Sequence, residues 1–593
     1  MQLMSVRALR LPVAGAAFLA LADTAIVALA LPPILRELDT DVAGVAAVLG
    51  VYAVVLAAAL PVAEWLRRAT GTRAVGAGGV GLFVLGSLVC GVSGSLVLLL
   101  VARGVQAAGG AALLVTAYVL LADGATGQRV WRLAALLGTA AGPAIGGALT
   151  QALGWRSIFL LQAPAALAAL PGCLTAPFPT PSARTEPAPA SPAYARAPAW
   201  SWLARALALG LVSGAVAVAL FLTVLLLIGG WGIEPLAAAA VVSIMPLSAL
   251  VATRIRGPSA VRAAGGCLLV AAGTASLAFL PNAAVGWTFL PQIAVGTGMG
   301  MALPALAGDL LPERSGRDAA RLLSVRHAGI AFALLLLAPI AQHELNVTLE
   351  KTRERGAALI LDARLDPRVK LEVAPKLAKS VETEDPRGGL EKVFADGRGD
   401  VDEDELDDYD DLTRRADETL VAGVNDGFGI AFSVGAALAL LAAALLAPSA
   451  LSATGALELR SRARVVPRPR AAGRAGGPPP AAAVSPRGAV LGLACAAVLA
   501  IGGFALAAET ARPEPVQIAD PCEDRDVPGS GGVTGFLQDA ALVALDHIAC
   551  RAGSSREELV LALVDDESAK RYEERYGIDP RSALDLAKVT LPG

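Results

Sequence analysis

Long uncharged stretches alternate along the chain with short polar connections, and two longer segments are rich in charge. A helix needs about 20 mostly apolar residues to cross a bilayer, and thirteen stretches meet that requirement. Residues 344–425 and 509–593 instead have the composition of soluble protein. The pattern predicts an all-α membrane protein with small helical attachments. The predicted spans lie near residues 11–34, 43–65, 74–94, 97–121, 133–153, 157–175, 206–229, 235–253, 261–281, 286–309, 322–343, 427–450 and 488–508.

Arginines are concentrated in every second connection between these spans. Basic residues in short loops favour the cytoplasmic side, so we expect a cell-membrane protein whose N-terminus is cytoplasmic. Both charged segments and the C-terminus then lie outside the cytoplasm. The basic connections contain Arg7, Arg10, Arg67, Arg68, Arg73, Arg129, Arg132, Arg184, Arg196, Arg205, Arg254, Arg256, Arg262, Arg314, Arg317, Arg321 and Arg326.

Two segments rich in proline and alanine separate the spans into groups. Such a composition is typical of extended tethers without a core of their own. The expected units are an N-terminal six-helix bundle (1–175), a cytoplasmic Pro/Ala linker (176–205), a C-terminal six-helix bundle (206–450) with an extracytoplasmic insertion (344–425), a basic cytoplasmic linker (451–487), a thirteenth transmembrane helix (488–508) and a small extracytoplasmic helical domain (509–593).

Charge and motifs limit the possible functions. Only 17% of the 593 residues are charged and the formal net charge is −3, which gives no reason to expect a nucleic-acid partner. The sequence contains no P-loop, no nucleophile elbow and no metal-ligand cluster. We therefore expect no enzyme, no metal and no cofactor, and a protein that works as a monomer among membrane lipids. Transport would then draw its energy from an ion gradient, with protons as the first candidate.

Asp23 and Arg103 lie inside predicted spans, where an ionisable group costs about 2.5–3.5 kcal/mol and usually serves a function. A carboxylate in such a place can bind and release a proton near neutral pH, whereas an arginine stays charged. Gln106 lies one turn after Arg103 on the same helix face and can hydrogen-bond to it or to a substrate. The alternative is structural, with Asp23 joining helices and Arg103 packing or extending to the interface.

The fifth predicted span is unusually rich in small residues. Gly138, Gly142 and Gly146 recur every four residues, a spacing that lets a neighbouring helix approach closely in a membrane. Pro143 removes a backbone donor and allows a bend, and Gly147 adds another small position. This stretch predicts a closely packed, bent membrane helix.

Four stretches carry a resemblance to the major facilitator superfamily, within it to the drug:proton antiporter group of multidrug efflux proteins. They occur in the order and on the spans where that family has its motifs. They are Asp23 to Pro32, Arg103 to Gln106, Gly142 to Gly147, and Trp155 to Phe159 with Gln162 and Pro164.

The resemblance implies a fold of two six-helix bundles around a midplane cavity, here with one extra C-terminal helix. It implies secondary active export of small amphipathic compounds by alternating access, coupled to protons. Asp23 would carry the proton, and Arg103 and Gln106 would relay it. The alternative is a scaffold or sensor that has lost transport and acts through its extracytoplasmic parts, where a protein partner could bind.

The connection after the second span departs from the family pattern. Glu64 stands where the family has Gly, and Arg68 stands where it has the Asp that helps to lock the cytoplasmic side. Arg67 and Arg73 keep the connection basic. Gating is therefore expected to differ, and Glu64 is the candidate substitute for the missing acid.

Cys522 and Cys550 are the two cysteines outside the predicted spans. In an oxidising compartment they are expected to form a disulfide; the alternative is two unrelated thiols. In the same segment Ser555 and Glu558 have the spacing of a capping box at the start of a helix.

Overall fold

Helices make up most of the described part of the computed structural model. The described residues are 6–582 except 122–123, 176–198, 312–314, 381–385, 464–485, 524, 526 and 529–531. The elements are α1 (Val6–Ala28), α2 (Leu31–Glu37), α3 (Val42–Thr70), α4 (Thr72–Gly91), α5 (Leu96–Leu121), α6 (Gly124–Leu153), α7 (Arg156–Leu167), α8 (Leu170–Leu174), α9 (Ala199–Val224), η1 (Leu225–Gly230), α10 (Pro235–Val242), α11 (Ile244–Ala252), α12 (Ser259–Ser276), η2 (Leu277–Phe279), α13 (Gly286–Leu310), α14 (Gly316–Asp362), α15 (Pro367–Ser380), α16 (Pro386–Gly397), η3 (Arg398–Asp400), α17 (Leu406–Ala463), α18 (Pro486–Ala511), α19 (Gly532–Ala552), α20 (Arg556–Val564) and α21 (Asp566–Tyr576).

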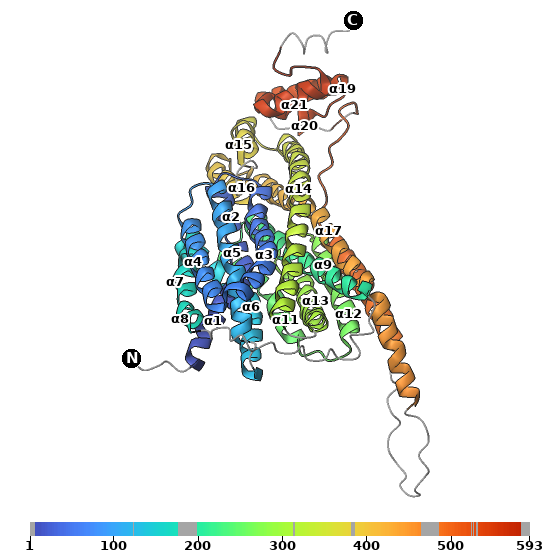
Figure 1. Ribbon diagram of the computed structural model, residues 1–593. Coiled ribbons are helices and arrows are strands. Elements are labelled where there is room, and N and C mark those ends of the chain that lie inside the picture. Colours follow the sequence, from blue (N-terminus) through green and yellow to red (C-terminus); the bar gives the residue numbers. More distant parts are fainter. Residues whose placement is uncertain are drawn as a thin grey trace.

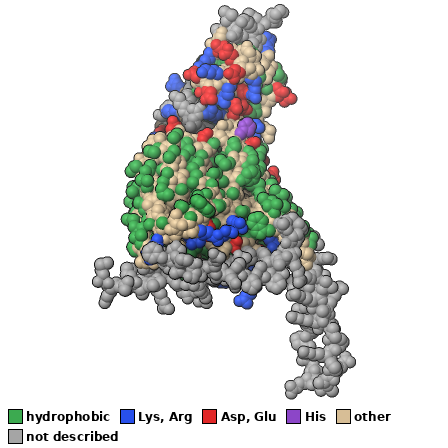
Figure 2. Space-filling model, in the orientation of Figure 1, with side chains coloured by type: hydrophobic (Ala, Val, Ile, Leu, Met, Phe, Trp, Pro, Cys, Tyr) green, Lys and Arg blue, Asp and Glu red, His purple; other side chains and the backbone are tan. Residues whose placement is uncertain are grey.

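Twelve helices of the described chain are long and apolar enough to cross a membrane. Eleven of them coincide with predicted spans, and the twelfth is α19. The predicted spans 133–153 and 488–508 also form helices, α6 and α18. The described apolar stretch of α18, Cys495–Ala511, is short, so the crossing of the membrane by this helix stays a prediction. Figure 2 shows the consequence, a broad band of hydrophobic side chains between a charged upper part and a lower edge rich in Lys and Arg.

The helices form two bundles that stand side by side (Figure 1). Helices α1 to α8 pack on one another in the first bundle, and α9 to α14 pack with α17 in the second. Helix α3 packs along α14, and α6 packs on α10 and α11, so that these contacts join the bundles. Buried apolar residues of both bundles belong to one core cluster.

Two of the spanning helices are much longer than hydropathy predicts. The predicted span 322–343 is part of α14, which continues to Asp362, and the span 427–450 is part of α17, which begins at Leu406. No proline interrupts residues 344–362, so the helix can continue after leaving the apolar layer. Much of the insertion 344–425 therefore consists of helix extensions, with α15 and α16 between them, rather than a separate domain.

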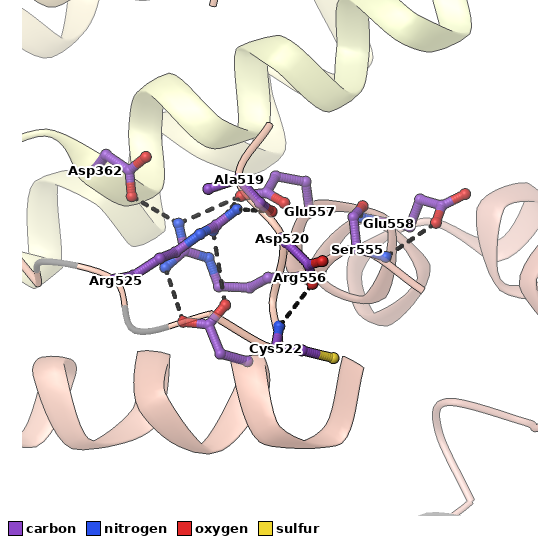
Figure 3. A network of polar contacts seen from close by, with 10 residues as sticks. Asp362, Ala519, Asp520, Cys522, Arg525, Ser555, Arg556, Glu557 and Glu558 are labelled. Atoms are coloured by element: carbon purple, nitrogen blue, oxygen red, sulfur yellow. Dashed lines mark hydrogen bonds and ion pairs between the residues drawn. The ribbon is translucent and has the colours of Figure 1, made fainter. Parts of the chain in front are cut away.

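These extensions carry a structure that we call the head, residues 344–425 and 509–582. Helices α15 and α16 of the first charged segment and α19 to α21 of the second lie at the same end of the molecule (Figure 1). Figure 3 shows how they join: Arg556 of α20 donates to Asp362, the last residue of α14, at 2.6 Å. Arg571 of α21 lies 3.5 Å from Glu350 of α14. We call this side of the molecule the head side.

The C-terminal part of the head is held together by a cross-link and a cap. Cys522 and Cys550 form a disulfide, and Ser555 and Glu558 form the capping box at the start of α20. The hydropathy of the sequence predicted no span in residues 509–593, whereas α19 has the length and composition of a span. In the structure α19 lies in the head, against α15 and α20.

The two linkers lie largely outside the described residues. Of the Pro/Ala linker 176–205, the structure describes a helix from Ala199 onward, the start of α9. Of the basic linker 451–487, it describes the end of α17, which reaches Ala463, and the first residues of α18.

Candidate functional site

Asp23 and Arg103 meet in the interior of the first bundle. Asp23 lies on α1 and Arg103 on α5, and both side chains are fully buried. Arg103 Nη2 donates to Asp23 Oδ2 at 2.6 Å, and Nη1 donates to Oδ1 at 3.0 Å. The planar guanidinium thus matches the carboxylate with two parallel hydrogen bonds. The structure places together two ionisable residues that the sequence could only place in separate spans.

Neutral oxygens accept two further hydrogen bonds from Arg103. Its Nη1 also donates to Gln106 Oε1 at 2.6 Å, and its Nε donates to the backbone oxygen of Val48 on α3 at 3.3 Å. The guanidinium carbon lies 4.3 Å from the centre of the Tyr52 ring, a cation–π contact. Arg103 is therefore fixed from α1, α3 and its own helix.

Gln106 and Gln162 close the network. Gln106 Nε2 donates to Ser87 Oγ of α4 at 2.9 Å and to Gln162 Oε1 of α7 at 2.7 Å. Gln162 Nε2 then donates back to Asp23 Oδ1 at 3.3 Å. Five helices of the first bundle contribute to one charge-balanced polar cluster, and breaking any member leaves a buried group without its partner.

The interior of the second bundle also contains buried polar side chains, among them Gln292, Thr274 and Thr288. Gln292 Nε2 donates to Thr288 Oγ1 at 3.0 Å. The Gln292 Oε1 and Thr274 Oγ1 atoms are buried without a hydrogen-bond partner among the described residues. Groups of this kind can form hydrogen bonds to a bound molecule, whereas Asp23, Arg103 and Gln106 of the first bundle already bond to one another or to neighbouring groups.

The glycines of α6 bring that helix close to α1, which carries Asp23. A methyl group added at Gly142 would lie 2.7 Å from Ala25 Cβ, and one added at Gly146 would lie 2.2 Å from the Ile26 carbonyl oxygen. Gly138 faces the Phe18 oxygen of the same helix. Larger side chains at these positions would force α6 away from α1.

Gly147 faces the other bundle. A methyl group there would lie 2.7 Å from the Pro235 oxygen and 2.4 Å from Ala239 Cβ, both of α10. Pro143 lies inside α6, which continues to Leu153. Helix α6 thus packs tightly on both α1 and the second bundle, which is the role that its small residues predict.

Glu64 lies at the opposite end of the bundle seam from the head. Its carboxylate is nearly buried and accepts from Arg67 at 2.8 and 3.0 Å and from Arg68 at 3.2 Å. A Cβ placed on Gly316, the first residue of α14, would lie 3.1 Å from Glu64 Oε1. A helix N-terminus carries partial positive charge, so α3 and α14 meet in an attractive arrangement. Arg73 lies nearby at the start of α4.

Comparison with known proteins decides the family. The family model of the Major Facilitator Superfamily matches residues 13–334, more than half of the chain. The chain belongs to the major facilitator superfamily. An inward-facing, occupied structure of a bacterial homologue of the human lysosomal transporter Spinster shares the fold, with a TM-score of 0.52 and 16% identity over 74% of this chain and 95% of that one.

Relatives of this major facilitator protein are named for drug export. The Multidrug resistance protein B homolog of Mycobacterium tuberculosis is 37% identical over 161 residues, 26% of this chain and 30% of that protein. The Drug efflux pump JefA of the same species is 34% identical over 154 residues, 25% and 30% of the two chains. The chain thus spans about a third of the length of these relatives. The resemblance to the multidrug efflux group is confirmed, and the spanning helices make the chain a multi-pass membrane protein.

Sequence reasoning found three members of the site and missed others. Gln162 appeared only as part of the fourth motif stretch and with no role assigned to it, although it bonds to both Gln106 and Asp23. Ser87 and Tyr52 gave no signal, because a serine or a tyrosine in an apolar span is common. Their roles depend on which helix faces are adjacent, and that requires the fold.

Proposed function

We propose that this transporter exports small amphipathic compounds in exchange for protons. The observation that supports the proposal most strongly is the buried Asp23–Arg103 pair, enclosed by Gln106 and Gln162. An ionisable pair in a membrane interior is costly and usually functional. The names of the multidrug relatives support the substrate class.

In the proposed cycle, Asp23 takes up its proton only when Arg103 moves away from it. Protonation removes the negative charge, so the guanidinium then depends on its neutral acceptors, the Gln106 and Val48 oxygens. Gln162 can follow either partner because its amide both donates and accepts. Release of the proton on the other side restores the ion pair, and the change between the two arrangements is coupled to the movement of the bundles.

We place the head outside the cytoplasm and the N-terminus inside, in the cell membrane. The lower edge of the apolar band in Figure 2 is rich in Lys and Arg, as expected of a cytoplasmic face. Exposed arginines of that face include Arg68, Arg254 and Arg256. The disulfide lies in the head, on the opposite side, where an oxidising compartment would maintain it.

In this orientation Glu64 acts at the cytoplasmic gate. Its carboxylate lies beside the N-terminus of α14. There it takes the place of the family's Asp, whose position is occupied by Arg68 in this chain. Arg67 and Arg68 hold the carboxylate in position. Glu64→Gln keeps the shape and removes the charge, so we expect faster hydrogen exchange at residues 316–320 than in the unaltered protein. Equal exchange would rule out this role for Glu64.

The proton role is tested with Asp23→Asn in proteoliposomes that carry an imposed pH gradient. The probes are ethidium and a set of neutral amphipathic dyes. We expect the unaltered protein to move a probe in a gradient-dependent way and Asp23→Asn to fall to background. Asp309→Asn is the matched control, because Asp309 lies at the C-terminal end of α13, 3.9 Å from Arg205. This variant should keep full transport.

Two outcomes would contradict the proposal. Gradient-driven transport that survives in Asp23→Asn would remove Asp23 from proton coupling. Absence of gradient-driven transport of every probe by the unaltered protein would instead remove the exchange of protons for amphipathic compounds.

A further inference from the structure

The seventh span ends on the head side in an unusual conformation. Helix α9 passes into η1, a π-helix, whose last turn is closed by bonds from Trp231 N to Leu226 O at 2.8 Å and from Ile233 N to Leu227 O at 2.9 Å. Wide helical turns of this kind are rare and often mark functional positions. The turn from residue 231 to 234 then leads into α10.

Trp231 is held by the head and by the extension of α17. Its indole Nε1 donates to Asn425 Oδ1 at 2.9 Å, and its backbone oxygen accepts from Arg387 Nη1 of α16 at 3.2 Å. Arg387 is itself fixed by two hydrogen bonds to Asp417, at 2.7 and 3.0 Å. The indole N–H and the backbone oxygen of Trp231 are thus both bound by residues of the insertion 344–425.

The same turn continues into contacts with the first bundle. Gln151, near the end of α6, accepts from the Leu236 backbone N–H at 2.9 Å and donates to Glu234 at 3.0 Å. Helix α2 of the first bundle packs on η1. Residues 225–236 therefore lie between the head, the second bundle and the first bundle, where the two bundles meet on the head side.

We propose that residues 225–236 form the head-side gate and that Arg387 is the positioning residue through which the head holds this gate closed. Opening on the head side requires the Gln151 contacts to separate, because they cross between the bundles. While Arg387 and Asn425 hold Trp231 in place, the turn stays where its residues Glu234 and Leu236 contact Gln151. The turn can then not move away from Gln151. The insertion thus acts as a clamp on the gate, and release of Arg387 from the Trp231 oxygen accompanies opening. The inference rests on transport by two moving bundles and not on proton coupling.

The test is hydrogen–deuterium exchange on the full chain in lipid nanodiscs, without substrate or gradient. We expect the amides of residues 225–236 to exchange about tenfold faster in Arg387→Ala, the change in opening that loss of one charged hydrogen bond produces. Arg398→Ala is the matched control, because Arg398 forms a two-bond pair with Asp410 in the same head. It should leave this segment unchanged, and residues 57–70 at the other end of the seam should be unchanged in both.

Equal exchange of residues 225–236 in Arg387→Ala and Arg398→Ala would overturn the proposal. Faster exchange throughout α19 and α20 would mean that Arg387→Ala has loosened the whole head. In that case Asn425→Ala decides, because Asn425 lies on α17 and bonds the indole directly; unchanged exchange in that variant would also overturn the clamp. Because no transport is measured, a failure here is separate from a failure of proton exchange.

Discussion

Arg103 and Arg556 are both fully buried in the described part of the chain, and their surroundings differ. Arg103 in the membrane pairs with one carboxylate, Asp23, and its other hydrogen bonds go to neutral oxygens. Arg556 in the head contacts three carboxylates, Asp362, Asp546 and Glu557, at 2.6 to 3.4 Å.

Water explains the difference. In the membrane an unbalanced charge has no solvent to stabilise it, so one arginine is matched by one acid. In the head Arg525 shares the Asp546 and Glu557 carboxylates (Figure 3), so two arginines meet three acids. The surplus negative charge is tolerated because the Asp362 side chain is 53% exposed to water. A single proton on Asp23 ends the balance of the membrane pair, because Arg103 stays charged. The cluster in the head instead fastens the C-terminal part onto α14.

The largest expected effect comes from breaking the membrane pair on one side. Asp23→Leu leaves Arg103 charged and buried, which should lower stability by about 3–5 kcal/mol. The double variant Asp23→Leu/Arg103→Met removes both charges and should recover most of that loss. Thermal unfolding of the purified protein in detergent measures both. If the double variant were less stable than the single one, the pair would be stabilising through more than charge balance.

The disulfide should contribute the next largest effect, and only in the head. The core of the C-terminal part is small, built around Ala549, Leu559, Ala562 and Tyr572. Cys522→Ser/Cys550→Ser opens a loop of 28 residues, which should cost roughly 3.5 kcal/mol. Proteolysis between residues 509 and 582 should accelerate, with the spanning helices unaffected.

The control for the disulfide is Cys495→Ser, because Cys495 is a free, exposed thiol. Its proteolysis pattern should match that of the unaltered protein. A pattern like that of the double variant would assign the effect to thiol chemistry in general.

Removing Arg556 should have a smaller effect than breaking the membrane pair. Arg556→Met leaves the buried Glu557 and Asp546 carboxylates with Arg525 alone, and we expect a loss of about 2–3 kcal/mol in head stability. Adding Glu557→Gln should restore part of it. Hydrogen exchange of α20 measures both.

The matched control for Arg556 is Arg581→Met. Arg581 pairs with Asp566 at the surface, and exposed pairs contribute about 0–1 kcal/mol. An equally large effect of both variants would mean that burial of Arg556 is unimportant for its role.

Hydropathy predicted where the chain crosses the membrane but not where its helices end. The apolar stretch 322–343 marks the part of α14 inside the bilayer, while the helix continues to Asp362 because its polar residues still favour helix and still find partners. Composition alone cannot separate a helix that leaves the membrane from a separate domain. The head therefore emerged only from the structure.

The ionisable residues of the site could be predicted, because a charged residue in an apolar span costs free energy and usually has a function. Asp23 and Arg103 stand out because charge is rare in apolar spans, and motif order placed Gln106 beside them. Gln162 and Ser87 are ordinary residues whose importance comes from facing that pair. The contact of Glu64 with the start of α14 joins positions 252 residues apart (316 − 64), which no local pattern contains.

The smallest expected effect concerns a carboxyl group between α14 and the C-terminal part of the head. Partial burial, together with the Glu558 and Glu350 carboxylates, raises the pKa of Glu354 from 4.5 to about 7, against the opposing charge of Arg575. The docked state thus prefers the protonated form. Its contribution to docking is complete below pH 4.5 and is lost as the pH rises through about 7.

The Glu354 carboxyl lies beside a cavity of about 310 Å³, and the charged residues around it come from both sides of the contact. They are Glu350 and Arg353 of α14, and Glu558, Arg571, Glu574 and Arg575 of α20 and α21.

We therefore expect the head of the unaltered protein to unfold at a lower temperature at pH 8 than at pH 5.5. Glu354→Gln should remove most of this difference, which we put at about 1 kcal/mol because water screens a partly exposed group. Glu391→Gln, an exposed acid on α16, should leave it unchanged. If the pH dependence persisted fully in Glu354→Gln, it would come from the carboxylates that Arg525 and Arg556 contact. Burial also raises the pKa of one of them, Asp546. The excess of acids around Arg525 and Arg556 would then be what distinguishes the head from the balanced Asp23–Arg103 pair.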